Sequence, residues 1–350
     1  MLTMYLEERI KSFAGLGEIL RNVLDGKGGK NEKKLNSLID NQHKHNPWFT
    51  PDNVRMALRA IADELTSDNL KEWTDSYPDL KIDSAPIRVG VIMAGNIPLA
   101  GFHDFLSVLI SGNNLIAKTS SKDSELIVHI SDILCSINSG FRDKIEFTEG
   151  ILSRIDAVIA TGSDNSSRYF EYYFGKYPNI IRKNRNSVAV IEGTETDIEH
   201  TNLGRDIFSY FGLGCRNVSK IFVPDMYDFD RMIRNWNGYS GIISHAKYAN
   251  NYDFNMAVSL VNKDIFLDTG FLLLKESKKL VSPVSVLYYE YYNSADKVYE
   301  QLHGYKEKIQ CIVGKRGVAF GKAQSPRLWD YADDIDTLDF LLKKNMAGIL

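Results

Sequence analysis

The sequence is poor in cysteine: its 350 residues include Cys135, Cys215 and Cys311, which lie far apart with no CxxC pair. This pattern argues against a disulfide framework or a zinc site and predicts a reducing compartment. The seven histidines show no metal-ligand spacing, so no metal is expected. No apolar run approaches the roughly 18 residues of a membrane-spanning helix, and residues 1–20 lack the pattern of a leader peptide. We therefore expect a cytoplasmic protein with no membrane span.

A surplus of charge of one sign is also missing. The chain has 42 Lys and Arg against 45 Asp and Glu, a formal net charge of -3, and the basic residues alternate with acidic ones. Nucleic-acid-binding proteins usually carry a clustered basic face. We expect a small-molecule ligand and no nucleic acid. The length is enough for two domains, or for one domain with a large insertion.

The first half of the chain predicts an α/β fold. Residues 1–80 have the period of charged helices, interrupted by a polar loop at 25–34. Strands and helices then alternate: strand 87–93, helix 98–112, strand 113–118, helix 121–137, strands 144–150 and 155–160, helix 162–175 and strand 187–193. Such alternation predicts a parallel sheet with crossover helices.

A second α/β domain is expected to begin near residue 206. Its predicted elements are a helix leading to Cys215, strand 220–224, a helix near 227–236, strand 284–292, helix 295–304 and strand 308–314. Their order repeats the strand and helix alternation less regularly.

Three motifs follow strands of the first series, where open α/β sheets bind their ligands. The loop AGNIP presents the amide of Asn96, although a turn asparagine is equally ordinary there. Lys118 ends the next strand and is either a ligand-binding or a solvated lysine. Thr161, Gly162 and Ser163 begin a helix whose free amides suit a phosphate, and an N-cap serine is the alternative.

The stretch FGLGCRNVSKIFVP places Cys215 between small, flexible neighbours and before an apolar strand. A cysteine kept for packing gains little at such a corner, whereas a nucleophile needs to be accessible. We interpret Cys215 as a nucleophile that takes an acyl group. Cys135, on the apolar side of a helix, and Cys311, inside a strand, fit the packing role.

Four segments in order, GNIPLAG, LIAK, ATGS and GLGCRNVSKIFV, resemble the aldehyde dehydrogenase superfamily and most closely its acyl-CoA reductase branch. The similarity covers roughly residues 85–330. It implies a Rossmann-type cofactor domain with a second α/β catalytic domain. We assign residues 1–205 to an N-terminal helical segment and the nicotinamide-binding domain, 206–318 to the catalytic domain, and 319–350 to a segment packing back on the cofactor domain.

The resemblance also implies roles for the motif residues. Cys215 would be the nucleophile, Asn96 an oxyanion donor and Lys118 the ribose-binding lysine, with Thr161, Gly162 and Ser163 at the phosphates. Ser121 stands where NAD-preferring members often have a glutamate, so NADPH is expected, with NADH possible. The alternative for Ser121 is a cap on a helix beginning at Lys122.

One departure from the superfamily bears on the reaction. The glutamate that activates water in hydrolytic members has its counterpart at Ile181 or Arg182. Without that base an acyl-enzyme would resist water and exchange with a thiol such as CoA. We expect NADPH-dependent reduction of a fatty acyl thioester to the aldehyde, by a homo-oligomer. The alternatives are an acyl transferase, a short-chain acylating aldehyde dehydrogenase and a non-catalytic nucleotide-binding scaffold.

Overall fold

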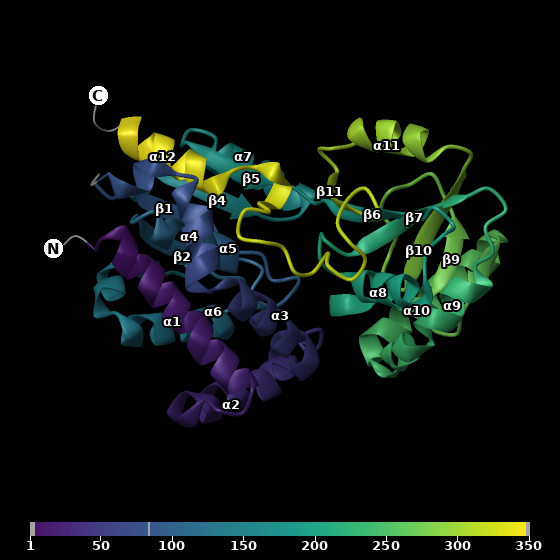
Figure 1. Ribbon diagram of the computed structural model, residues 1–350, viewed down its shortest axis with the longest axis horizontal. Coiled ribbons are helices and arrows are strands. Elements are labelled where there is room, and N and C mark those ends of the chain that lie inside the picture. Colours follow the sequence, from purple (N-terminus) through teal and green to yellow (C-terminus); the bar gives the residue numbers. More distant parts are fainter. Residues whose placement is uncertain (1–3, 83–84, 348–350) are drawn as a thin grey trace. The chain divides into compact units, whose positions relative to one another are not determined.

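The structure is a computed structural model that describes residues 4–82 and 85–347. The chain forms two compact units (Figure 1). The first comprises Met1–Lys183 and Arg327–Leu350, and the second comprises Asn184–Pro326.

The first unit is built on a parallel sheet with the strand order β3-β2-β1-β4-β5. Its strands are β1 (Arg88–Ile92), β2 (Asn114–Lys118), β3 (Ile145–Phe147), β4 (Ala157–Thr161) and β5 (Asn179–Arg182). The chain moves outward from β1 to β3 and returns to β4 on the other side of β1. This reversal of strand order is the place where such sheets bind ligands, beyond the carboxyl ends of the strands.

Helices cover both faces of this sheet. The helices of this unit are α1 (Leu6–Leu24), α2 (Gly29–His45), α3 (Pro51–Glu64), α4 (Ser67–Asp75), α5 (Phe102–Ile110), α6 (Glu125–Ile137), α7 (Asp164–Phe174) and α12 (Thr337–Ala347). Val89 and Val91 of β1 belong to the large core that contains α1, α5 and α6. Val158 and Ile116 point to the other face and pack in a smaller core with Phe174 of α7. Successive residues of a strand point to opposite faces of the sheet, which is why the two cores take alternate strand residues.

The second unit has a six-stranded sheet in the order β11-β6-β7-β10-β9-β8, parallel except for β8. Its strands are β6 (Asn186–Val190), β7 (Val218–Pro224), β8 (Phe266–Asp268), β9 (Leu273–Glu276), β10 (Val286–Tyr292) and β11 (Ile309–Val313). The helices are α8 (Asp197–Phe208), α9 (Asp230–Trp236), α10 (Ala246–Asn262) and α11 (Ala295–His303). Within this unit α11 lies on one face of the sheet and α8 and α9 lie on the other (Figure 1). Tyr252 of α10 packs on Leu273 of β9 and Val286 of β10.

The predicted α/β class is confirmed, and three predicted elements need correction. The helix expected at 98–112 begins at Phe102, because Leu99 is held in a left-handed turn with a φ of 59°. The helix expected from residue 121 begins at Glu125. The strand expected to close the first series is β6, and it pairs with β7 and β11 of the second unit.

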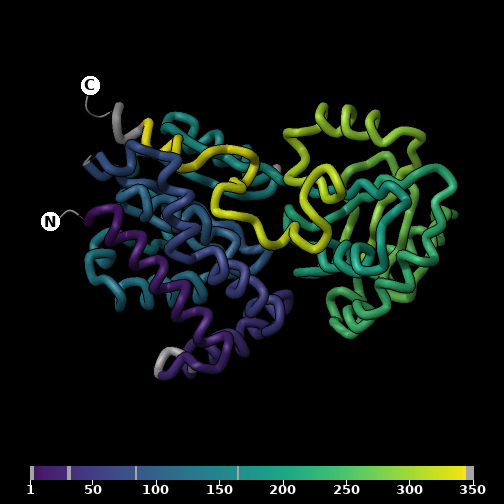
Figure 2. Tube along the Cα trace, in the orientation of Figure 1, coloured from purple at the N-terminus to yellow at the C-terminus, as the bar shows by residue number. Residues whose placement is uncertain are grey.

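The unit boundaries therefore differ from those expected at 205/206 and 318/319. Residues 184–205 and 319–326 belong to the second unit, since β6 and the start of α8 pack on its sheet. The C-terminal segment from Arg327, yellow in Figure 2, belongs to the first unit. There Trp73 donates its indole N–H to the hydroxyl of Tyr331 at 2.8 Å, and Leu338 and Leu341 are fully buried.

Candidate functional site

Asn96 is exposed on the loop that leaves β1 in the first unit. Two contacts hold this loop against the one that follows β2. Oδ2 of buried Asp123 accepts the backbone N–H of Leu99 at 2.6 Å. At Gly95 a Cβ would come within 2.3 Å of the Ser120 hydroxyl oxygen, so only glycine allows the loops to approach this closely. These two contacts help to fix the backbone that carries Asn96.

Asp123 is an acid that sequence reasoning did not single out. Its side chain is 5% exposed, and burial raises its pKa to about 7. Oδ1 is buried with no hydrogen-bond partner, whereas Oδ2 receives the Leu99 N–H. The hydrogen bond favours the ionised form but does not outweigh burial.

Lys118 is the last residue of β2 and stands beside Ile92, the last residue of β1. Its Nζ donates to the carbonyl of Gly150 at 3.0 Å. Ser121 and Lys122 follow in an exposed turn. The alternative role of Ser121 as a cap is wrong, because α6 begins at Glu125, after Ser124.

Thr161, Gly162 and Ser163 join β4 to α7 at the same carboxyl edge of the sheet. Ser163 is the N-cap of α7, and its hydroxyl accepts the backbone N–H of Ser166 at 3.3 Å. Ser163 therefore caps α7, as the alternative interpretation of this motif predicted. It does not oppose an anion site, because a capped α-helix still presents N–H groups and the positive end of its dipole.

A buried ion pair lies next to this turn. Nη1 of Arg182 donates to Oδ2 of Asp104 at 2.6 Å and lies 3.4 Å from the Thr161 hydroxyl oxygen, while Nη2 donates to Thr337 at 2.9 Å. Arg182 is 3% exposed and Asp104 is 5% exposed. The pair joins β5, α5, β4 and α12. The sequence signal for this pair was Asp104, the only acid in the mostly apolar helix 102–110.

Cys215 is exposed and occupies a tight turn in the second unit. The turn is closed by a hydrogen bond from the backbone N–H of Asn217 to the carbonyl of Gly214, at 3.0 Å. The hydroxyl of buried Ser187 donates to the carbonyl oxygen of Cys215 at 3.0 Å. The thiol therefore stands on a firmly held backbone at the surface of its unit, as a nucleophile requires.

The other two cysteines are in different surroundings. Both are partly buried and pack against apolar cores, Cys135 in the first unit and Cys311 in the second. Burial raises the pKa of the Cys135 thiol, which makes it a poorer nucleophile at neutral pH. Sγ of Cys311 lies 3.0 Å from the hydroxyl of Ser187.

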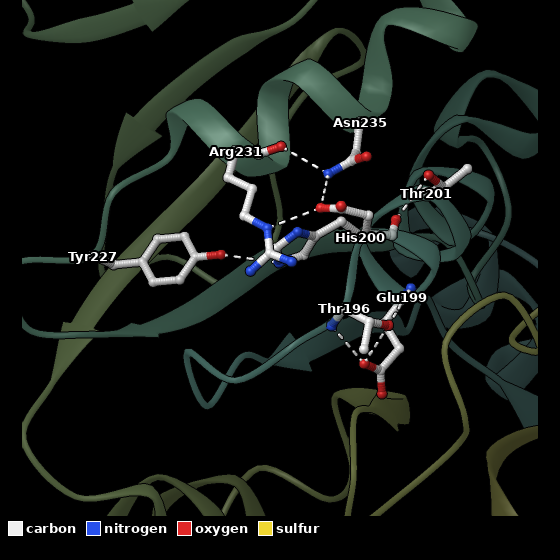
Figure 3. A network of polar contacts seen from close by, with 8 residues as sticks. Thr196, Glu199, His200, Thr201, Tyr227, Arg231 and Asn235 are labelled. Carbon is white, nitrogen blue, oxygen red and sulfur yellow. Dashed lines mark hydrogen bonds and ion pairs between the residues drawn. The ribbon is translucent and has the colours of Figure 1, made fainter.

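The helix α8, which leads toward Cys215, is anchored at its start by a polar network (Figure 3). Thr196 and Glu199 form a reciprocal cap: Thr196 Oγ1 accepts the Glu199 N–H at 3.2 Å, and the Glu199 carboxylate accepts the Thr196 N–H at 2.7 Å. Asp197 accepts hydrogen bonds from Arg231 at 2.8 Å and Asn235 at 2.9 Å, both on α9. These contacts fix α8 against α9.

His200 extends the same network inward. Its Nε2 lies 3.2 Å from the hydroxyl of Tyr227, and its carbonyl accepts the indole N–H of Trp236 at 2.9 Å. Burial lowers the pKa of His200 and raises that of Tyr227 to about 12, so both are neutral at physiological pH. The pair is a structural anchor for α8.

Lys220, the first residue of the predicted strand 220–224, is the third residue of β7 and is fully buried. It forms an ion pair with Glu290 of β10, and its Nζ lies 4.7 Å from the ring centroid of Phe222. Because its charge is neutralised inside the sheet, Lys220 supports β7 and is not a surface group.

In the ranges 4–82 and 85–347, no helix is both long and apolar enough to cross a membrane. The same part of the chain brings together no group of three or more His, Cys, Asp or Glu side chains able to hold a metal ion.

The sequence is similar to curated bacterial proteins, although no family model matches it. It is 24% identical over 240 residues to the long-chain acyl-protein thioester reductase of Aliivibrio fischeri. The aligned stretch covers 62% of this chain and 49% of that protein. A second relative, long-chain acyl-protein thioester reductase 2 of Photobacterium leiognathi, is 24% identical over 192 residues, or 49% of this chain and 40% of that protein. The match thus spans less than half the length of either relative.

Solved structures with the same fold are aldehyde dehydrogenases. A putative aldehyde dehydrogenase from Burkholderia cenocepacia matches with a TM-score of 0.65 at 12% identity, over 89% of this chain and 74% of that one. Aldehyde dehydrogenase 21 from Physcomitrella patens, in complex with succinate, also matches with a TM-score of 0.65 at 12% identity, over 97% and 88% of the two chains. The chain therefore has the aldehyde dehydrogenase fold and a sequence similar to the long-chain acyl-protein thioester reductases, which confirms the resemblance expected from its motifs.

Proposed function

We propose that this protein is an acyl thioester reductase, which reduces a fatty acyl-CoA or another acyl thioester to the aldehyde with NADPH. The observation that carries the proposal is the exposed Cys215, held on a rigid turn within an aldehyde dehydrogenase fold. The names of the similar bacterial proteins, long-chain acyl-protein thioester reductases, support the substrate class.

Cys215 would form the acyl-enzyme. Its thiolate attacks the thioester carbonyl carbon, and the backbone N–H of Cys215 stabilises the oxyanion. The resemblance to the aldehyde dehydrogenases assigns the role of a second oxyanion donor to Asn96. When the oxyanion collapses, the carbon–sulfur bond to the original thiol breaks and that thiol leaves with a proton. A thioester on Cys215 remains.

A nicotinamide cofactor would bind at the carboxyl edge of the first unit's sheet. Lys118 and Thr161 end strands there, and Ser121, Gly162 and Ser163 come after them, at the reversal of strand order and at the start of α7. These features fit a dinucleotide. When bound, the nicotinamide supplies the hydride that reduces the acyl carbon. Cys215 then departs as thiolate, and the aldehyde is released.

The surroundings of Arg182 support transfer to a thiol over hydrolysis. Neither Ile181 nor Arg182 offers a carboxylate, and the nearby carboxylate of Asp104 is engaged by Arg182 at 2.6 Å. A water-activating base is therefore missing from the position where hydrolytic aldehyde dehydrogenases carry one. We infer that the acyl-enzyme persists long enough to be reduced.

The preference for NADPH rests on Ser121 and Lys122, which are exposed after β2 and beside Lys118. A serine can donate to a 2′-phosphate where a glutamate would repel it, and the two lysines add positive charge.

The test is to incubate the protein with acyl-CoAs of increasing chain length and NADPH, following nicotinamide absorbance and free thiol together. Reductase activity predicts equal amounts of thiol released and nicotinamide oxidised. Thiol release without oxidation would indicate a transferase, and no reaction at any chain length would favour the scaffold. Cys311→Ala serves as the matched control and should react like the wild type.

A further inference from the structure

The backbone that leads from α8 to Cys215 has an unusual conformation. Tyr210 has a φ of 51°, Phe211 has a φ of 59° and Gly212 has a φ of 78°. A left-handed conformation is unfavourable for a residue other than glycine, and it normally occurs at single positions. Three consecutive left-handed residues, two of them aromatic, persist only where surrounding contacts impose them.

Asn217 supplies those contacts. Its side-chain Nδ2 lies 2.8 Å from the carbonyl oxygen of Ser209, immediately before the left-handed residues, and 3.1 Å and 3.3 Å from those of Asp206 and Ile207 in α8. Its Oδ1 accepts the backbone N–H of Gly214, immediately before Cys215, at 2.8 Å. One amide therefore joins both ends of the left-handed segment.

The same residue closes the turn that presents the thiol. Its backbone N–H donates to the carbonyl of Gly214 at 3.0 Å, so Cys215 and Arg216 form the middle of the turn. Asn217 is 2% exposed, and water therefore competes little for its hydrogen bonds. Through Asn217 the nucleophile is connected to α8, which the network of Figure 3 fixes at its other end.

We propose that Asn217 is a positioning residue for Cys215. By imposing the left-handed segment and the turn, it sets the direction in which the thiol meets the acyl carbon. This inference rests on the proposed role of Cys215 as the acylated nucleophile. Misplacing a reacting group by about 1 Å can cost about 100-fold in rate, so a purely positional effect should be large.

The test compares Asn217→Ala and Asn217→Asp with the wild type, by the rate at which acyl-CoA forms an adduct on Cys215. We expect Asn217→Ala to acylate about 10- to 100-fold more slowly at a similar half-saturating concentration. Asn113→Ala is the matched control: Asn113 is also fully buried, accepts the Ile87 N–H at 3.1 Å and donates to Ser111 at 3.0 Å. It should lower the melting temperature but leave the acylation rate within about twofold of wild type.

Asn217→Asp adds a readout that lost stability alone would not give. It keeps an acceptor for Gly214, but its ionised carboxylate faces three carbonyl oxygens, and protonation restores one donor. Its acylation rate relative to wild type should therefore rise as pH falls, whereas that of Asn217→Ala should not. Both variants acylating within about twofold of wild type, with no pH trend in the ratio, would overturn the inference. No adduct on wild-type Cys215 would overturn the proposed function and this inference together.

Discussion

Asn96 and Cys215 are exposed side chains on backbone that neighbouring residues hold in place. Asp123 and Gly95 define the loop of Asn96, while Ser187 and Asn217 define the turn of Cys215. Preorganisation of this kind lets a donor or nucleophile act without rearranging its surroundings during the reaction.

Replacing Asn96 should affect turnover more than substrate affinity, because an oxyanion donor acts mainly in the transition state. We expect Asn96→Ala to lower kcat by about 100- to 1,000-fold with a much smaller change in KM. Steady-state kinetics with a saturating nicotinamide measure both constants. A kcat close to wild type would show that Asn96 is only a turn residue.

Ser121 should influence the choice of nicotinamide. In Ser121→Glu a carboxylate would repel the 2′-phosphate of NADPH and accept from the 2′-hydroxyl of NADH. The ratio of kcat/KM for NADPH over NADH should favour NADPH in the wild type and fall in the variant. Lys122→Gln, a neighbouring exposed position, is a control for the loss of local positive charge. A wild-type preference for NADH, or a ratio unmoved by Ser121→Glu, would contradict the assignment.

At the scale of elements, Asp123 links the loops after β1 and β2 and should make the first unit's stability depend on pH. Its folded pKa of about 7 lies above its unfolded value, so the folded state binds the proton more tightly. The free energy of unfolding should therefore fall as pH rises from 4 to 7, by about 4 kcal/mol at most.

The matched variant is Asp123→Asn, which cannot ionise and keeps an oxygen to accept the Leu99 N–H. Denaturant unfolding followed in the first unit at pH 4, 5, 6 and 7 gives the difference between the two proteins. Wild type should lose stability relative to Asp123→Asn across that range. A constant difference would mean that Asp123 keeps an ordinary pKa.

The chain's local patterns predicted most elements of the two sheets. The apolar runs 113–118 and 220–224 predict strands, and they correspond to β2 (Asn114–Lys118) and β7 (Val218–Pro224). Helix α10 was missed because its apolar residues lack a clear helical period, and Phe254 and Val261 prove to be exposed. β8 and β9 are short strands without a strong pattern of their own.

The supporting residues of the candidate site could not be predicted in the same way. Arg182 pairs with Asp104, which is 78 residues away in the sequence, and Ser187 hydrogen-bonds to the carbonyl of Cys215, which is 28 residues away. Such partners depend on how strands are ordered in the sheet, which local periodicity does not specify. The motif residues were identifiable because each lies near the end or the beginning of a strand that the local sequence predicts.

At the scale of the whole molecule, the chain enters the second unit once, at Asn184, and returns to the first at Arg327. Deleting the chain after Pro326 should therefore weaken the first unit and spare the second. The deletion removes the hydrogen-bond partners of Trp73 and Arg182, which are the hydroxyls of Tyr331 and Thr337. It also exposes the apolar core into which Leu338 packs. Hydrogen exchange with mass spectrometry should show lost protection in residues 85–183 and unchanged protection in 184–326. Equal loss in both units would contradict this division.

The most direct test of the proposed function is intact-protein mass spectrometry after acyl-CoA is added without a nicotinamide, followed by peptide mapping. Wild type and Cys311→Ala should each gain one acyl group, and it should map to Cys215. Cys215→Ala should gain none and retain its melting temperature, because an exposed thiol contributes little to packing. An adduct that survives in Cys215→Ala, or maps to Cys135 or Cys311, would contradict the assignment of Cys215 as the nucleophile.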